Sequence, residues 1–206
     1  STQESADNAV SKLKEKYPDA VVAGMSPDLS NYESVRNAFI DATTKYGCVD
    51  ILVNNAGVCR LEKFENMADE LRDFHFDINI KGAWNTTKIC LPYMKNRKAS
   101  IINLSSVTGP MVADSGEVAY ATTKGAVEMM TKALASEWAK KGITVNAIGP
   151  AYFASEMTAS IIEEDFFQPV VQAYCPMAEN RCCQRLSAAA PVPRPKDTSP
   201  GPPARR

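Results

Sequence analysis

Residues 49–57 read VDILVNNAG, and this stretch decides the fold class of the chain. It opens with a continuous apolar run, which is typical of a β-strand buried on both faces of a sheet. The run stops at NNAG (54–57), where asparagine and glycine favour a tight turn and let a flat ligand approach the backbone. We therefore expect a central strand followed directly by a binding loop.

The alternation of strand and helix continues on both sides of this stretch. Short apolar runs predict further strands at 20–24, 100–106 and 143–150. Helix-forming stretches, most with apolar side chains at helical spacing, predict helices at 3–16, 31–46, 68–91 and 118–140. Strands that alternate with helices pair in parallel, so the sequence predicts an α/β fold with a sheet covered on both faces.

Composition excludes several classes of protein. The 206 residues suit one domain with its own core. The formal net charge of −1 gives no sign of a nucleic-acid or anionic-membrane partner. No apolar run approaches the roughly 18 residues that span a bilayer, and the first residues lack the pattern of a signal peptide. We expect a cytoplasmic protein with neither a nucleic-acid nor a membrane partner.

Cysteine and histidine give little support to metal or hydrolase chemistry. The six cysteines are Cys48, Cys59, Cys90, Cys175, Cys182 and Cys183. An even count is compatible with disulfides, but the chain is long, shows no secretory signal and has no zinc-binding spacing, so we expect reduced thiols and no metal. A serine–histidine hydrolase would have to use His75, the only histidine, and no nucleophile elbow lies near it. We expect His75 to be structural.

The stretch YATTK at 120–124 places a tyrosine and a lysine on one face of a predicted helix. An ammonium beside a phenol favours the phenolate, so we expect Lys124 to lower the pKa of Tyr120 toward the range of general acid–base catalysis. Ser106 closes a predicted strand and could hold a substrate oxygen there. Asn79 interrupts a helix and is either a kinked turn or an amide that holds water beside the lysine. Alone, the Tyr-x-x-x-Lys pair is equally compatible with a surface pair.

Four segments together resemble the short-chain dehydrogenase/reductase family. They are DILVNNAG at 50–57, SSVTG at 105–109, YATTK at 120–124 and ITVNAIGP at 143–150. The resemblance covers residues 1–177 and implies a Rossmann-like doubly wound parallel sheet. It further implies an oxidoreductase that moves a hydride between NAD or NADP and the carbonyl or alcohol group of a small substrate. A dimer or tetramer of identical subunits is implied as well.

The resemblance also implies a role for each site residue. Tyr120 matches the proton donor and acceptor, and Lys124 matches the lysine that binds the nicotinamide ribose. Ser106 matches the residue that holds the substrate oxygen, and Asn79 the asparagine of the proton relay. The implied cofactor contacts are Asp28, Leu29, Asn55, Ala56, Gly57, Tyr120, Lys124, Pro150, Phe153 and Ser155. The segment that chooses between NAD and NADP in the family has no counterpart here.

The chain departs from the family pattern at both ends. The first two strands and the glycine-rich phosphate turn are absent, which leaves 20–24 without a neighbour and exposes an apolar edge of the 49–55 strand. The proline- and arginine-rich tail at 178–206 replaces the family's last strand, as a shifted reading frame or alternative exon would explain. We expect the tail to be disordered, although PVPRP (191–195) could bind a proline-recognising domain.

Two functions therefore stay open. The first is the oxidoreductase, with residues 151–177 as a substrate lid. Apolar side chains in that segment form either a substrate wall or ordinary core; they are Phe153, Met157, Phe166 and Phe167. The second is a truncated, non-catalytic chain that acts through subunit contacts made by the helices at 68–91 and 118–140.

Overall fold

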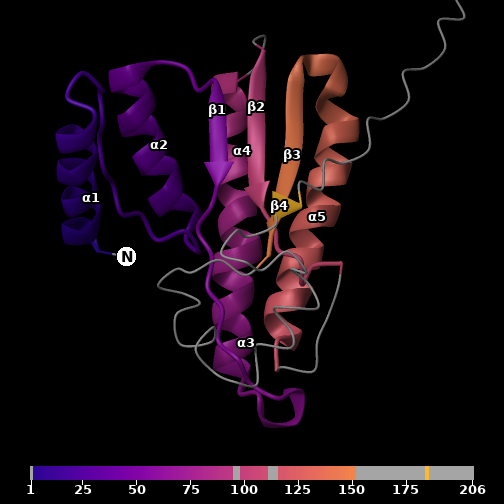
Figure 1. The fold of residues 1–206 in the computed structure, drawn as a ribbon. Helices are drawn as coiled ribbons and strands as arrows, with labels where there is room; N and C mark the ends of the chain where they lie inside the picture. Colours follow the sequence, from indigo (N-terminus) through magenta and orange to yellow (C-terminus); the bar gives the residue numbers. More distant parts are fainter. Residues whose placement is uncertain (1, 95–97, 111–115, 152–183, 186–206) are drawn as a thin grey trace, which may run out of the picture.

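The computed structural model describes residues 2–94, 98–110, 116–151 and 184–185, in which a small sheet packs against helices (Figure 1). The elements in chain order are α1 (Gln3–Lys16), α2 (Tyr32–Tyr46), β1 (Ile51–Asn54), η1 (Phe64–Asn66), α3 (Asp69–His75), η2 (Phe76–Gly82), α4 (Ala83–Met94), β2 (Ala99–Leu104), α5 (Val118–Trp138), η3 (Ala139–Lys141), β3 (Ile143–Pro150) and β4 (Gln184–Arg185). The segment η2 is π-helical and joins α3 to α4. All four predicted helices are present.

The sheet has the order β1-β2-β3-β4. The first three strands are parallel, with Ile51 opposite Ser100 and Ile101 opposite Val145. The two residues of β4 pair antiparallel with the end of β3. The predicted α/β fold with a parallel sheet is confirmed, and the three predicted strands that form it lie side by side.

The ends of the first two helices follow from local chemistry. Thr2 caps α1 by accepting a hydrogen bond from the Ser5 amide, and Asn31 caps α2 by accepting one from the Ser34 amide. Gly47 ends α2 with a φ of +84°, a backbone conformation that side chains with a β-carbon disfavour. These signals are readable in the sequence, which is why the helix bounds were predictable.

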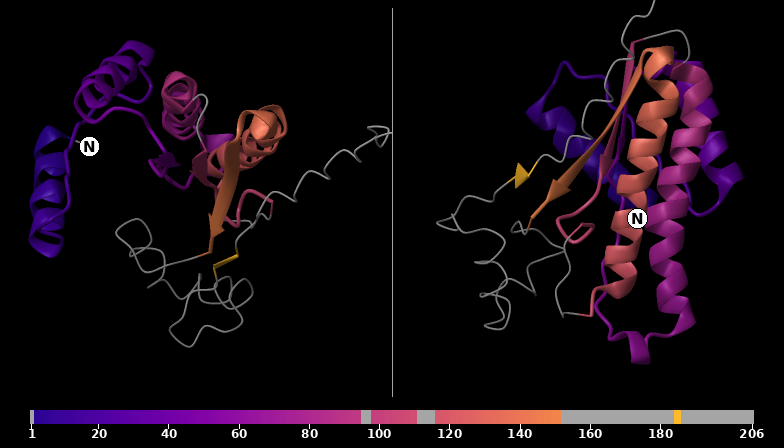
Figure 2. Two further views of the ribbon diagram at one scale, coloured as in Figure 1. Left: turned by 90° about the horizontal axis from the view of Figure 1, so that it is seen from above. Right: turned by 90° about the vertical axis from the view of Figure 1, so that its right-hand side faces the viewer.

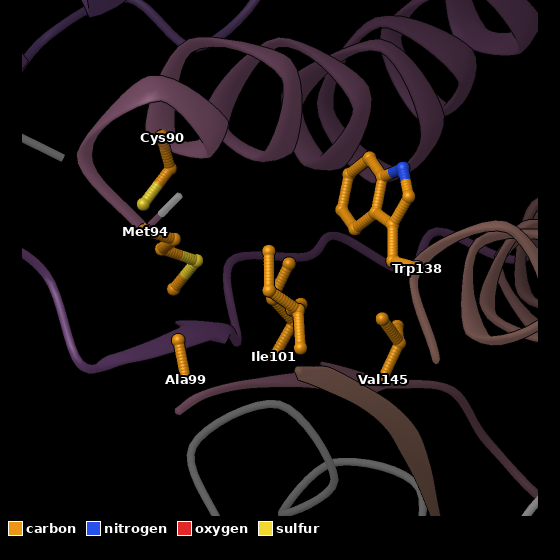
Figure 3. Close-up of a cluster of buried hydrophobic side chains, with 7 residues drawn as sticks. Cys90, Met94, Ala99, Ile101, Trp138 and Val145 are labelled. Atoms are coloured by element: carbon orange, nitrogen blue, oxygen red, sulfur yellow. The ribbon is translucent and has the colours of Figure 1, made fainter. Parts of the chain in front are cut away.

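The core lies between the sheet and the pair α4 and α5 (Figure 3). It consists of Cys90, Met94, Ala99, Ile101, Trp138, Ile143 and Val145. Alternate residues of β2 and β3 are buried on this side, as the two-residue period of a strand requires. Helices α4 and α5 thus fix the sheet from one side.

The described helices cover only this one face of the sheet (Figure 2). On the other face, Thr144 and Asn146 of β3 are exposed. In β1, the side chains of Ile51 and Val53 are 63% and 51% exposed. The expectation that 49–55 is buried on both faces is therefore wrong, because among the described residues β1 has one neighbouring strand and a helix layer on one side only.

The predicted strand at 20–24 is also absent. These residues carry no strand pairing, and Val21 is 83% exposed. The carbonyl oxygen of Gly24 accepts a hydrogen bond from Gln3 Nε2 instead (3.2 Å). A strand needs a second strand to satisfy its backbone groups, and no described strand lies beside this segment.

The division at residue 177 is not tested by the described residues. Residues 152–183 and 186–206 lie outside them, and with them the predicted lid and most of the predicted tail. Within the tail, only Gln184–Arg185 are described, as the short strand opposite Gly149 and Pro150. The boundary between 1–177 and 178–206 stays a prediction.

Candidate active site

The carboxyl ends of β1, β2 and β3 meet at one edge of the sheet, beside the start of α5 (Figure 1). Two hydrogen bonds hold this edge together. The Ser105 amide donates to the Ile148 carbonyl (2.8 Å), and the Val107 amide donates to the Pro150 carbonyl (3.0 Å). Ligands of parallel α/β sheets bind at such edges, so this is the candidate site.

Ser106, Tyr120 and Lys124 gather at this edge. The Ser106 hydroxyl lies close enough to the Tyr120 phenol to lower its pKa. Ser106 Oγ in turn accepts hydrogen bonds from the Thr108 amide (3.3 Å) and hydroxyl (3.0 Å). Lys124 is buried, with Nζ 5.6 Å from the centroid of the Tyr120 ring. The sequence placed these three side chains together, and the structure does so too.

The pKa of Tyr120 moves in the direction opposite to the prediction. Burial raises it to about 12, and the nearby Cys59 and Glu117 add to the rise, while the hydrogen bond with Ser106 opposes it. Lys124, whose Nζ donates to the Leu104 carbonyl (2.7 Å), does not offset this effect, because it loses its own proton at a lower pH than the phenol does. Burial also lowers the pKa of Lys124 to about 8. Desolvation is the largest cause of both shifts.

Asn79 lies buried in the π-helical segment η2, a type of segment that is frequent at functional sites. Its amide clamps the backbone of Val58: Oδ1 accepts from the Val58 amide (2.8 Å), and Nδ2 donates to the Val58 carbonyl (2.9 Å). Nδ2 also donates to Thr123 Oγ1 (2.9 Å). Both amide hydrogens are committed to protein acceptors, so a water at this side chain would have to bind Oδ1.

The loop after β1 runs between Asn79 and Lys124. A β-carbon at Gly57 would lie 3.3 Å from Lys124 Nζ and 3.5 Å from Asn79 Oδ1, so a side chain here would crowd the ammonium. Asn55 and Ala56 are exposed. The predicted binding loop is therefore open to a ligand on one side and in contact with the lysine on the other.

Asn54 has a different role from its neighbour. Its Nδ2 donates to Thr87 Oγ1 (2.9 Å) and to Asn103 Oδ1 (2.8 Å), and Thr86 donates to its Oδ1 (2.6 Å). Asn103 Nδ2 in turn donates to Thr131 Oγ1 of α5 (2.8 Å). This network joins β1, β2, α4 and α5 directly beneath the site. In the sequence, the only sign of this network is an asparagine inside each of two apolar strands.

The sequence pattern did not indicate three further residues near Tyr120. Cys59 and Glu117 act on its pKa, and the buried Thr123 donates to its backbone carbonyl (2.7 Å). Burial also raises the pKa of the Cys59 thiol to about 12. Nothing in their spacing marked these residues, because they reach the site through the fold.

The predicted adenine-side residues lie between α1 and α2. Asp28 accepts hydrogen bonds from the Ser30 amide (2.9 Å) and hydroxyl (2.7 Å), which lower its pKa. The Leu29 carbonyl accepts from Asn85 Nδ2 (3.0 Å), which fastens this segment to α4. Pro150 is half-buried at the end of β3. Phe153 and Ser155 lie outside the described residues.

His75 is fully buried, and backbone groups engage both of its ring nitrogens. Nε2 accepts from the Arg60 amide (3.0 Å), and Nδ1 pairs with the Leu71 carbonyl (2.8 Å). The structural role predicted for His75 is confirmed. Cys48, Cys59 and Cys90 are free thiols.

Two features are absent from the described residues. No group of three or more metal-ligating side chains is gathered among them. Within the same residues, none of the helices combines the length and the apolar character needed to cross a bilayer.

Comparison with known proteins places this geometry in a family. The model of the short chain dehydrogenase family matches residues 1–165. The chain is 55% identical over 146 residues to the oxidoreductase UcpA of Escherichia coli (strain K12), a match that covers 70% of this chain and 54% of UcpA. It is 34% identical over 164 residues to the 3-oxoacyl-[acyl-carrier-protein] reductase FabG of Staphylococcus aureus, covering 79% of this chain and 65% of FabG.

A solved structure gives the same result. The fold matches a gluconate 5-dehydrogenase from Burkholderia cenocepacia J2315 in complex with NADP and tartrate, with a TM-score of 0.75 and 28% identity over 85% of this chain and 68% of that one. The chain spans about half the length of the first curated relative it matches. Because the family match covers most of the chain and the fold agrees, the chain belongs to the short chain dehydrogenase family.

Proposed function

We propose that this chain carries the proton-transfer site of an oxidoreductase that moves a hydride between NAD or NADP and the carbonyl or alcohol group of a small substrate. The observation that carries the proposal is the gathering of Ser106, Tyr120 and Lys124 at the carboxyl edge of the sheet, with Lys124 buried and its Nζ 5.6 Å from the centroid of the Tyr120 ring. The relatives named as an oxidoreductase and a reductase support it. We expect the reaction in the cytoplasm.

Tyr120 is the acid in carbonyl reduction. With a pKa of about 12 it carries its proton at neutral pH, as a group that protonates a nascent alkoxide must. The Ser106 hydroxyl holds the same substrate oxygen, within reach of the phenol. In the oxidation direction the phenol must first lose its proton, and its raised pKa makes this direction the more demanding one. Asn79 fixes the loop on which this arrangement rests.

The described residues fit the two ends of a nicotinamide dinucleotide better than its pyrophosphate. The cofactor supplies or accepts the hydride when bound. Lys124 and the open loop 55–57 suit a ribose and a flat ring, with Pro150 on the nicotinamide side and Asp28 and Leu29 toward the adenine. The other nicotinamide contacts that the resemblance implies, Phe153 and Ser155, lie outside the described residues. Among the described residues no glycine-rich turn opens a helix at this edge, so backbone donors for a pyrophosphate are missing there. We expect chain 1–206 to bind NADH and NADPH weakly or not at all.

The decisive variant is Tyr120→Phe, which removes only the hydroxyl. In a longer form of the protein that turns over a small ketone, we expect kcat to fall by roughly 10²–10⁴-fold, with Tyr32→Phe on the exposed start of α2 as the matched control. NADH or NADPH oxidation measured by absorbance reports the rate. If turnover of every carbonyl substrate is unchanged in Tyr120→Phe, the mechanism is wrong.

Cofactor affinity tests this chain directly. Fluorescence titration of residues 1–206 with NADH and with NADPH is expected to show no saturation at micromolar concentrations. A micromolar dissociation constant for either cofactor would overturn the expected weak binding and would show that the pyrophosphate finds other donors.

A second candidate function is supported by exposed apolar side chains on the helices. Trp84 of α4 and Met129 of α5 are 56% and 62% exposed, and Phe76 of η2 is also exposed. Where such side chains form one patch, they are typical of a protein contact. We propose that this helical face joins another subunit, either an identical one or a family homologue that this chain regulates without catalysis. Sedimentation that finds only monomers, alone and mixed with a homologue, would count against it.

A further inference from the structure

We propose that Thr123 is a positioning residue: its hydroxyl locks the loop after β1 and the segment η2 against the turn of α5 that carries Tyr120 and Lys124. The consequence for catalysis rests on the proposed function, whereas the lock itself does not. The sequence pattern gives Thr123 no role, because it lies between the two residues of the Tyr-x-x-x-Lys pair and resembles a helix-filling side chain.

The contacts define a continuous chain of hydrogen bonds. Thr123 Oγ1 donates to the Tyr120 carbonyl (2.7 Å) and accepts from Asn79 Nδ2 (2.9 Å). Asn79 in turn holds both backbone groups of Val58. One hydroxyl therefore connects the catalytic turn of α5 to η2, and through η2 to the loop after β1. Thr123 is fully buried, so no water competes for these bonds.

This chain of bonds fixes the surroundings of the lysine. Val58 follows Gly57, whose α-carbon lies so close to Lys124 that an added β-carbon would sit 3.3 Å from Nζ. If Asn79 loses its partner, the clamp on Val58 loosens and the loop can move away from the ammonium. Water then reaches Lys124, and the desolvation that lowers its pKa is relieved.

The chain provides a matched set of variants. Thr123→Val keeps the shape and removes the hydroxyl, while Thr123→Ser keeps the hydroxyl. The adjacent Thr122 is exposed on the same helix, so Thr122→Val makes the same chemical change outside the lock. A loss of helix propensity or bulk affects the two valine variants alike, and only the lock separates them.

The first readout is the titration of Lys124 in chain 1–206, followed by NMR of labelled lysine. In Thr123→Val the pKa is expected to rise from about 8 toward 10.5, the ordinary lysine value, and in Thr123→Ser and Thr122→Val it is expected to stay near 8. A variant that is only less stable keeps the native titration in its folded fraction. A folded Thr123→Val with an unchanged Lys124, or a Thr123→Ser that behaves like valine, overturns the proposal.

The second readout is amide hydrogen exchange at Val58, whose N–H donates to Asn79. Losing the lock is expected to speed this exchange about tenfold in Thr123→Val relative to Thr122→Val. If Thr123→Val does not fold, hydrogen exchange in the unsubstituted chain provides the test. The side-chain amide hydrogens of Asn79 are expected to exchange far more slowly than those of the exposed Asn146. Equal rates would overturn the proposal. Neither readout needs NADH or NADPH, so failure of cofactor binding tests the proposed function separately.

Discussion

The apolar segments at 20–24 and 100–104 have opposite fates. The second is a strand paired on both sides, with Ile101 fully buried under α4 and α5. The first is unpaired, and Val21 lies in solvent. The same contrast separates the two sides of the molecule: β2, β3, α4 and α5 are packed, whereas β1 presents an open edge and α1 and α2 lie beside it (Figure 1). Apolar sequence makes a strand only where a partner strand and a covering layer are present.

The largest expected difference between the two sides is in core packing. Ile101→Ala creates a cavity in the core and is expected to lower the free energy of unfolding by about 2–5 kcal/mol. Val21→Ala removes exposed methyl groups and is expected to change it by less than about 0.5 kcal/mol. Urea unfolding followed by circular dichroism measures both. Equal losses for the two variants would mean that 20–24 is packed in solution.

The second prediction concerns pH and the buried Lys124 on the packed side. Its pKa falls from 10.5 to about 8 on folding, so between these values the unfolded chain binds more protons than the folded chain, and stability rises with pH. The free-energy cost of burying the charged Lys124 is fully present below pH 8. Tyr120 acts in the opposite sense above pH 10, because its pKa rises from 10.0 to about 12 and the folded chain keeps its proton longer. We expect stability to rise by about 2 kcal/mol from pH 8 to 10 and then to fall.

The control for the pH profile is Lys124→Met, which keeps the length of the side chain without the charge. Urea unfolding at a series of pH values is expected to show no rise between pH 8 and 10 in this variant. Lys81 on the exposed side of η2 provides the comparison, since Lys81→Met should leave the rise intact. If Lys124→Met keeps the rise, another group causes it.

The third prediction compares two asparagines, one on each face of the sheet. Asn103 is fully buried and bonded to Asn54 and Thr131, so Asn103→Ala leaves buried partners unsatisfied and is expected to cost about 1–2 kcal/mol. Asn146 is exposed on β3, and Asn146→Ala is expected to be nearly neutral. Thermal unfolding of the two variants ranks them. A reversed ranking would show that the other face of the sheet is the better packed one.

The smallest effect on stability is expected at the open edge. Val53→Lys places a charge on the exposed side of β1 and should change the free energy of unfolding by less than about 0.5 kcal/mol. Its larger effect is on association, because a lysine on an edge strand hinders pairing with another chain. Light scattering at rising concentration compares it with Thr144→Lys, which is exposed on β3 away from that edge. Equal association of the two variants would argue against pairing through β1.

Much of the fold follows from local sequence signals. Asn31 and Gly47 mark the two ends of α2, and alternating burial in β2 and β3 matches their apolar patterns. The failures at 20–24 and at the outer face of β1 share one cause. Whether an apolar run is buried depends on neighbours that are remote in the sequence. The local apolar pattern of the run does not show whether those neighbours are present.

Some features of the candidate site were likewise predictable from the sequence, and others were not. Spacing alone put Tyr120 and Lys124 on one face of a helix, and the position of Ser106 at a strand end brought it to them. The direction of the Tyr120 pKa was not readable, because it depends on how deeply both groups are buried. Nor was the engagement of Asn79 by Val58 and Thr123, which come from separate parts of the chain.

By itself the sequence determined the helices, the parallel order of strands and the membership of the short chain dehydrogenase family, since these follow from local periodicity and from motifs that stay in order. Only the tertiary structure decided which apolar segments pair as strands and which face of the sheet is covered. It also decided that Tyr120 keeps its phenolic proton at neutral pH. Pairing, burial and desolvation arise between residues far apart in the chain, and their free energies exist only once the chain is folded.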